Sequence, residues 1–279
     1  MQKSCRQRRM AEAMTEMRQW SVFLPKEHGA YGQITFPLVA AFGVAGFSAG
    51  GLLIAIAVIA AFLGHEPMAI VLGQRGVRAR RELRKRAMVW LGACVVAGAA
   101  AGAAAVATIS PGGRWSIAVP AVPGMVLIVA TIMRREKSWY GESSAALAFA
   151  GAAVPVTIAG GASLAAAWTV AIPFALLFTT TTLAVRVVIL RVRGGGDQRA
   201  TAATRRTTLA LCTVGAAALT ALTAVDLLSP WVLVSSVPGL LTATLVAVRP
   251  PAPAHLRRLG WRLVAVSTLT TAIVVMTAS

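Results

Sequence analysis

Long apolar runs recur along the whole chain. No other feature of the sequence restricts the possible folds of the chain as strongly. Runs of about 20 apolar residues match the thickness of a bilayer core, whereas helices of soluble proteins show amphipathic stripes. Of the 279 residues, 57% are hydrophobic and only 13% are charged, about half the charged fraction of a soluble domain. We therefore predict an all-α integral membrane protein.

The apolar runs predict nine membrane-spanning helices. In chain order they lie at about 33–48, 51–73, 87–109, 115–133, 143–160, 162–190, 207–227, 230–248 and 261–278, the first reaching back through 29–32. Residues 1–28 form a basic tail and residues 29–279 a single transmembrane domain. Because the tail lacks the apolar core of a cleavable signal peptide, we expect it to stay in the cytoplasm. Met17 is an alternative start to Met1.

Charge is distributed unevenly between the two sides of the predicted bundle. The net charge is +18, and by this topology all of the 27 Lys and Arg residues except Arg114 lie on or near one side. Basic loops mark the cytoplasmic side, so the N-terminus is predicted inside and the C-terminus outside a bacterial cytoplasmic (inner) membrane. The basic excess then indicates contact with anionic lipid head groups and argues against a nucleic-acid partner.

A weak internal repeat links the two halves of the chain. Pro37 and Pro155 are separated by the same interval as Cys94 and Cys212, and Val-Pro-Gly recurs at 122–124 and 237–239. These matches predict two related four-helix halves, about 29–135 and 143–250, followed by the ninth helix at 261–278. Since each half holds an even number of spans, the copies would have the same orientation.

Polar groups inside a membrane are costly and mark function by default. His65 and Glu66 precede Pro67 within the second predicted span, and Arg186 lies in the cytoplasmic part of the sixth. We predict that His65, Glu66 and Arg186 are catalytic and face one shared cytoplasmic cavity. The alternatives are that Glu66 locks two helices together through an ion pair or hydrogen bond, and that Arg186 extends to the lipid head groups.

A second polar group, Lys26-Glu27-His28, lies just before the first span. With Arg75, these residues are predicted to bind substrate; the alternative is an interfacial turn. Glu27, His28, His65 and Glu66 together would suit a divalent metal ion, since imidazole and carboxylate are its usual ligands. The sequence identifies no other cofactor.

Two motifs carry a family resemblance. The stretch WSVFLPKEHGAYGQITFPL (20–38) and HEP (65–67), with an arginine-rich loop after it, resemble the YwiC-like family of bacterial membrane proteins. That resemblance implies a membrane location and adds weight to the polar residues within both motifs, but it supplies no reaction.

The predicted architecture also looks like the UbiA prenyltransferase superfamily. Its members bind a Mg²⁺-coordinated isoprenoid diphosphate through Asp-rich motifs at the cytoplasmic ends of two spans. Here those places hold only Glu66 within the second span, Glu82 in the loop after it, and Asp197 after the sixth span. The likeness therefore implies a similar fold more strongly than it implies binding of a Mg²⁺-coordinated diphosphate.

Three functions fit these features, and the sequence leaves open whether the protein is an enzyme. An intramembrane transferase or lipid enzyme, acting on an isoprenoid or other lipid, predicts an apolar cavity that opens to the cytoplasm. A transporter of a small anion or metabolite predicts broken helices and a site between the two halves. A non-enzymatic membrane assembly factor predicts scattered polar contacts and no cavity.

Overall fold

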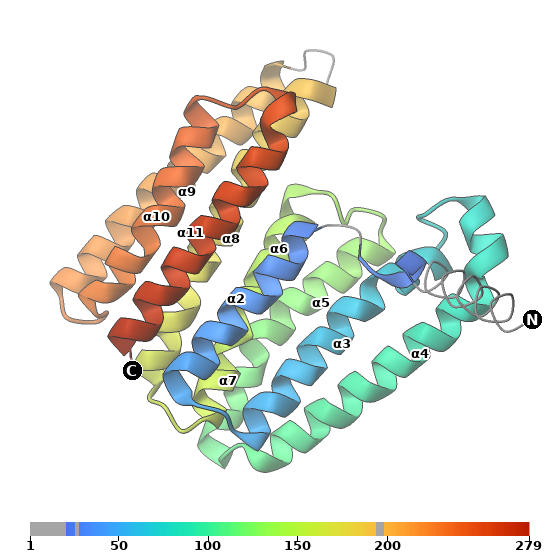
Figure 1. Cartoon of the computed structure of the whole chain (residues 1–279), viewed down its shortest axis with the longest axis horizontal. Coiled ribbons are helices and arrows are strands. Elements are labelled where there is room, and N and C mark those ends of the chain that lie inside the picture. The colour runs from blue at the N-terminus through green and yellow to red at the C-terminus, as the bar shows by residue number, and fades with distance from the viewer. Residues whose placement is uncertain (1–20, 26–27, 194–197, 279) are drawn as a thin grey trace, which may run out of the picture.

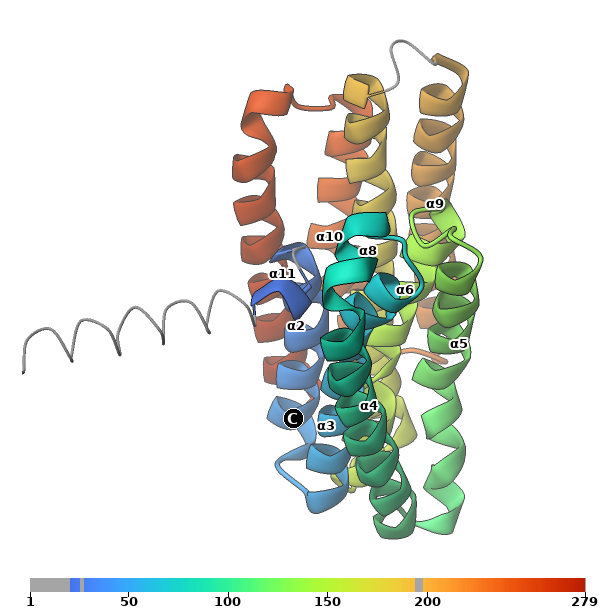
Figure 2. The same ribbon diagram turned by 90° about the vertical axis from the view of Figure 1, so that its right-hand side faces the viewer.

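A computed structural model describes residues 21–25, 28–193 and 198–278 as an all-helical bundle (Figure 1). The helices are α2 (His28–Ala45), α3 (Ala49–Val71), α4 (Val77–Thr108), α5 (Ala118–Ile132), α6 (Trp139–Gly151), α7 (Ala153–Ala159), α8 (Leu164–Arg193), α9 (Gln198–Ala224), α10 (Pro230–Val248) and α11 (Leu256–Ala278). Short 3-10 turns lie at η1 (Ser21–Phe23), η2 (Pro111–Ile117) and η3 (Pro253–His255). The helices run side by side along a common direction (Figure 2).

Helix length and composition confirm the membrane prediction. Within the described residues, eight segments are long and apolar enough to cross a bilayer, and a shorter apolar helix covers Gly29–Ala45. The 18 residues of α2 rise about 27 Å, slightly less than the ~30 Å hydrocarbon core. The chain is therefore a polytopic all-α membrane protein. A ninth span at α2 and the orientation in the membrane stay predictions.

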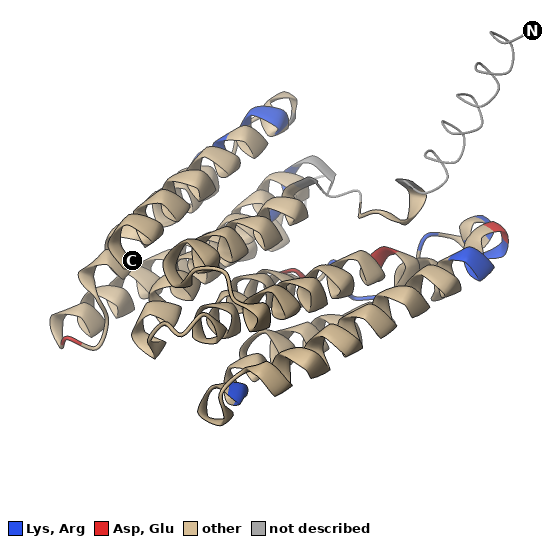
Figure 3. Ribbon diagram, turned by 60° about the horizontal axis from the view of Figure 1, so that its bottom comes forward, with Lys and Arg blue, Asp and Glu red and all other residues tan. Residues whose placement is uncertain are grey.

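Several helices extend beyond the predicted spans at the end of the bundle that carries most basic residues. We call this the basic end; it includes the connections 72–76, 133–138 and 249–255. α4 begins at Val77 rather than near 87, and α11 begins at Leu256 rather than near 261. Arginine and lysine are good helix formers, so these basic stretches continue the spans. Figure 3 shows Lys and Arg gathered at the helix ends.

The fifth predicted span is broken in two. The regular helix is interrupted at Ala152, between α6 and α7, although Ala152 keeps helical dihedral angles, whereas a single helix over 143–160 was expected. Pro155 explains the break, because it has no N–H to donate to the carbonyl of Gly151 and its ring crowds that oxygen. The combined segment remains long enough to be a candidate span, Trp139–Ala159.

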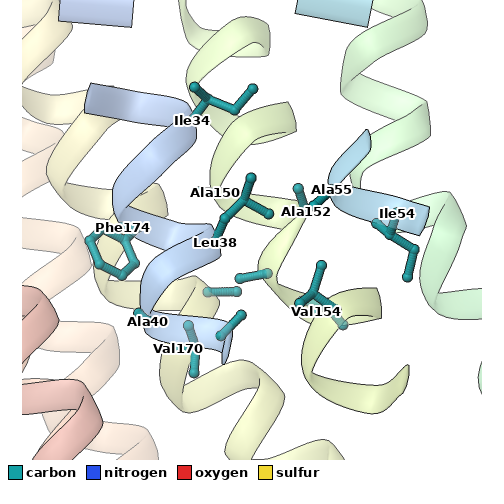
Figure 4. Close-up of a cluster of buried hydrophobic side chains, with 14 of the residues drawn as sticks. Ile34, Leu38, Ala40, Ile54, Ala55, Ala150, Ala152, Val154, Val170 and Phe174 are labelled. Atoms are coloured by element: carbon teal, nitrogen blue, oxygen red, sulfur yellow. The ribbon is translucent and has the colours of Figure 1, made fainter. Parts of the chain in front are cut away.

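The centre of the bundle is formed by α2, α6–α7 and α8. Figure 4 shows their apolar side chains meeting in one cluster, including Leu38, Val154 and Phe174. Small residues permit this close approach: a Cβ added to Gly160 would lie 2.6 Å from that of Ala45.

The predicted internal repeat stays a prediction. In the structure, the two halves of the chain pack differently. α10 packs against α8, α9 and α11, whereas its predicted counterpart α5 packs chiefly against α6. The division of the chain into a basic tail and one transmembrane domain likewise remains an expectation.

Candidate functional site

Two helices end at the basic end in the same type of turn. After α3, Gly73 has a φ of 77° and the N–H of Gln74 donates to the carbonyl of Ala69 at 2.9 Å. After α5, Arg134 has a φ of 59° and the N–H of Arg135 donates to the carbonyl of Ala130 at 2.7 Å. Such turns satisfy the last carbonyls of a helix and reverse the chain. Both connections therefore fold back over their own helices.

The reversal after α3 places Arg75 over Glu66. Arg75 donates from Nε to Oε1 of Glu66 at 2.8 Å and from Nη2 to Oε2 at 2.6 Å. The Glu66 side chain is 7% exposed and that of Arg75 is 29% exposed. The hydrogen bond to Glu66 and the charges of Glu66 and Glu136 raise the pKa of the Arg75 guanidinium above its usual value, although burial acts in the opposite direction. This two-point contact is the strong form of an arginine–carboxylate pair.

Glu136, in the 133–138 connection, joins the same cluster. Nη1 of Arg75 donates to its Oε1 at 3.1 Å, and Nε2 of His65 lies 3.3 Å from its Oε2. The second contact is an ion pair only when His65 is protonated, and it lacks hydrogen-bond alignment, since Oε2 has no hydrogen-bond partner among the described residues. One arginine thus bridges a carboxylate of α3 and a carboxylate of the 133–138 connection.

A second ion pair lies next to this connection and contacts it through one backbone carbonyl. Arg186 of α8 donates from Nη1 to the carbonyl of Lys137 at 2.7 Å and to Oε2 of Glu142 at 2.9 Å. Glu142 occupies the first turn of α6, and Ser138 lies just before this helix. The hydroxyl of Ser138 accepts a hydrogen bond from the N–H of Gly141 at 3.2 Å. Segment 133–138 therefore anchors both the Arg75 cluster and the Arg186 pair.

The predicted site residues fall into three groups. The structure brings His65, Glu66 and Arg75 together, whereas Arg186 pairs with Glu142 rather than approaching Glu66 directly. Lys26, Glu27 and the side chain of His28 lie outside the described residues. The roles assigned to all of them stay predictions.

Sequence reasoning overlooked Glu136. It lies between Arg135 and Lys137 in a basic stretch that resembles any solvated loop. A usable signal was present: the connection between the fourth and fifth predicted spans contains only two carboxylates, Glu136 and Glu142.

The predicted metal set cannot be assembled from the described side chains alone. Among them, no group of three or more His, Cys, Asp or Glu residues could hold a metal ion. The guanidinium of Arg75 also occupies the position between Glu66 and Glu136 that a cation would need. Because Glu27 and the His28 side chain are not described, the metal set remains a prediction.

A polar face of α8 leads from Arg186 toward the middle of the bundle. Thr179, Thr182 and Arg186 are spaced three and four residues apart, so they share one side of the helix. Nε2 of Gln33 on α2 donates to the hydroxyl of Thr182 at 3.3 Å. One turn deeper, the buried hydroxyl of Thr179 has no hydrogen-bond partner among the described residues.

Two cavities open elsewhere at the basic end. One, of about 410 Å³, lies between α10 and α11 and is lined by Leu245, Val246, Arg249, Pro251, His255, Arg258, Leu259 and Arg262. The other, of about 720 Å³, lies between α8 and α9 and is lined by Leu190, Arg191, Gln198, Thr201, Ala202, Arg205, Arg206 and Leu209. Neither is lined by His65, Glu66 or Arg186.

Comparisons with known proteins identify one family. A family model described as YwiC-like protein matches residues 24–157. No curated protein matches the chain. No solved structure matches it either, so the likeness to the UbiA superfamily stays a prediction. The matched region includes His65, Glu66, Arg75, Glu136 and Glu142, while Arg186 lies beyond it. Residues 24–157, just under half of the chain, thus match the YwiC-like protein family.

Proposed function

We propose that this protein is a membrane transporter for a small anion, described here with its cytoplasmic end closed. The observation that carries the proposal is the double attachment of segment 133–138. This one connection receives Arg75 from the α3–α4 side and Arg186 from α8. In this proposal the basic end faces the cytoplasm and the two attachments form a gate.

Ion pairs of this kind can open for an anionic solute. A guanidinium binds carboxylate or phosphate in the same geometry, so an incoming anion can replace a side-chain carboxylate. The Arg186–Glu142 pair is the better candidate for such an exchange, because its side chains are 25% and 30% exposed. Glu66, at 7% exposed, is more firmly enclosed by its partner.

Behind the gate, the bundle offers neutral hydrogen-bonding groups and then an apolar barrier. Gln33 and Thr182 lie one turn inward from Arg186, followed by the hydroxyl of Thr179, which has no hydrogen-bond partner in the part of the chain that the structure describes. Deeper still, the cluster containing Leu38 and Phe174 fills the centre. Opening would require helices to move, and the break between α6 and α7 supplies a place where a span can bend.

The lipid-enzyme alternative has less support. It expected an apolar cavity lined by His65, Glu66 and Arg186, whereas the two cavities described above at the basic end are lined by other residues. No observation specifically favours an assembly factor over a transporter, and the following experiment separates these two.

Cysteine accessibility tests the gate. In a chain with Cys5, Cys94 and Cys212 replaced by serine, we introduce Thr182→Cys and reconstitute the protein in liposomes. A membrane-impermeant maleimide should label this cysteine slowly from the cytoplasmic side. Adding Glu142→Gln should raise the rate about tenfold, the effect of weakening the closed state by ~1.4 kcal/mol. Val188→Cys, on an apolar-facing position that is 1% exposed, serves as the control and should stay unlabelled.

Transport further requires that Thr182→Cys be reached from the opposite side of the membrane. Labelling from that side, slowed by millimolar small anions, would support the proposal. A cysteine that is reached from one side only, with or without Glu142→Gln, would contradict transport and favour a protein with a static polar interior.

A further inference from the structure

We propose that the cavity between α10 and α11 binds the phosphate-bearing headgroup of an anionic phospholipid. Arg249 closes it from the end of α10, while Arg258 and Arg262 line it from the first turns of α11. Its apolar wall comes from Leu245 and Leu259. The site is distinct from the proposed gate, and the inference does not depend on transport.

The side chains from α11 are placed to act together. Arg258 and Arg262 are four residues apart on α11, so they lie on the same side of the helix, and Leu259 is adjacent to Arg258. His255 lines the cavity from η3, just before α11. Arg258 and Arg262, together with Arg249 at the end of α10, therefore line the same space of about 410 Å³. Guanidinium groups suit phosphate oxygens because they donate two parallel hydrogen bonds.

No carboxylate in this part of the chain balances these cations. Between residues 198 and 278 the sequence contains a single acidic residue, Asp226, which lies in the turn after α9 at the opposite end of the bundle. Among the described residues, no ion pair involves Arg249, Arg258 or Arg262. This contrasts with Arg75 and Arg186, which both have carboxylate partners. An anion from outside the chain would therefore neutralise the positive charge of the cavity.

The surroundings favour a lipid over a free phosphate. Leu245, which lines the cavity, is 65% exposed, and Trp261, on the next turn of α11, is 66% exposed. In a membrane protein, exposed apolar side chains on spanning helices face acyl chains, and tryptophan concentrates at the headgroup level. A basic pocket between spanning helices at that depth is the expected form of an anionic-lipid site. Three arginines further favour a lipid that carries two phosphates.

Native mass spectrometry of the full-length protein tests this site. The detergent-solubilised protein is titrated with cardiolipin, phosphatidylglycerol or phosphatidylethanolamine. We expect binding to decrease in that order, because the three headgroups carry two, one and no net negative charges. The double variant Arg258→Gln/Arg262→Gln should bind cardiolipin about tenfold or more weakly, while its melting temperature without lipid stays near that of the wild type.

A matched variant separates this cavity from general charge. Arg81→Gln/Arg84→Gln removes two exposed arginines from α4 at the same end of the bundle, and it should bind cardiolipin as the wild type does. Equal losses in both double variants, or wild-type affinity in the cavity variant, would overturn the proposal. Free pyrophosphate should compete only weakly; displacement of cardiolipin at equimolar pyrophosphate would overturn the lipid assignment in favour of a soluble phosphate ligand.

Discussion

Replacing Arg75 by methionine is expected to lower the free energy of unfolding by about 2–4 kcal/mol, near the ~3–5 kcal/mol seen when one partner of a fully buried ion pair is removed. The variant leaves the carboxylate of Glu66, 7% exposed, without its two-point partner. It also removes the contact to Glu136. We place the loss toward the lower value because Arg75 itself is 29% exposed to solvent. Equilibrium unfolding in mixed micelles, followed by circular dichroism, measures the change.

A second substitution should restore much of this loss. In Arg75→Met/Glu66→Gln no uncompensated charge remains at Glu66, so the double variant should be more stable than Arg75→Met alone. The control is Arg78→Met, which removes a solvent-exposed pair with Glu82 and should leave the free energy of unfolding nearly unchanged. If Arg75→Met costs as little as Arg78→Met, the buried pair is not a stabilising contact.

The sequence identified Glu66 but not its partner, for a physical reason. A carboxylate inside an apolar run must be neutralised or paired, so its position alone marks it. Its partner depends on how the chain reverses after α3, and the left-handed conformation of Gly73 determines that reversal. Seven basic residues follow Gly73 before residue 87, all of the same chemical type, and only the turn selects Arg75 among them.

Glu136 and Arg186 illustrate the complementary limit. Composition makes Glu136 look solvated, because three of its four nearest chain neighbours are basic. Its 12% exposed side chain reflects the approach of α3, which no local pattern encodes. Arg186 was predicted to share a cavity with Glu66 from equal depth along the chain. Equal depth, however, does not determine the direction in which a side chain points. The carboxylate that Arg186 contacts is that of Glu142, in the first turn of α6.

The span boundaries were easier to predict than the break in the fifth span. Bilayer thickness determines how long an apolar run must be, and the eighth predicted span coincides with α10. Proline does not by itself reveal a break: Pro67 and Pro173 lie inside the continuous helices α3 and α8. Near Pro155, by contrast, a short separate helix, α7, begins at Ala153 and packs against α2, α3 and α8.

Gly141→Ala should disrupt the site through the backbone of segment 133–138. A Cβ at this position would meet the carbonyl oxygens of Arg135 and Glu136, and backbone atoms cannot move aside as a flexible side chain can. We expect a loss of about 3 kcal/mol in the free energy of unfolding, the upper range for overpacking. The displaced connection should also withdraw Glu136 from Arg75. Unfolding in mixed micelles measures the first effect.

A glycine with open surroundings provides the control for this substitution. Gly92 lies within α4, and an added Cβ there would have no neighbour within 4 Å. Gly92→Ala should therefore stabilise the protein by about 0.5–1 kcal/mol, the usual gain of alanine in a helix interior. If Gly141→Ala withdraws Glu136, Arg75 has already lost one carboxylate partner in this variant. Arg75→Met should therefore lower the free energy of unfolding less in the Gly141→Ala background than in the wild type. Equal costs in both backgrounds would show that segment 133–138 does not depend on Gly141 for its position, and that Glu136 is held over Arg75 by other contacts.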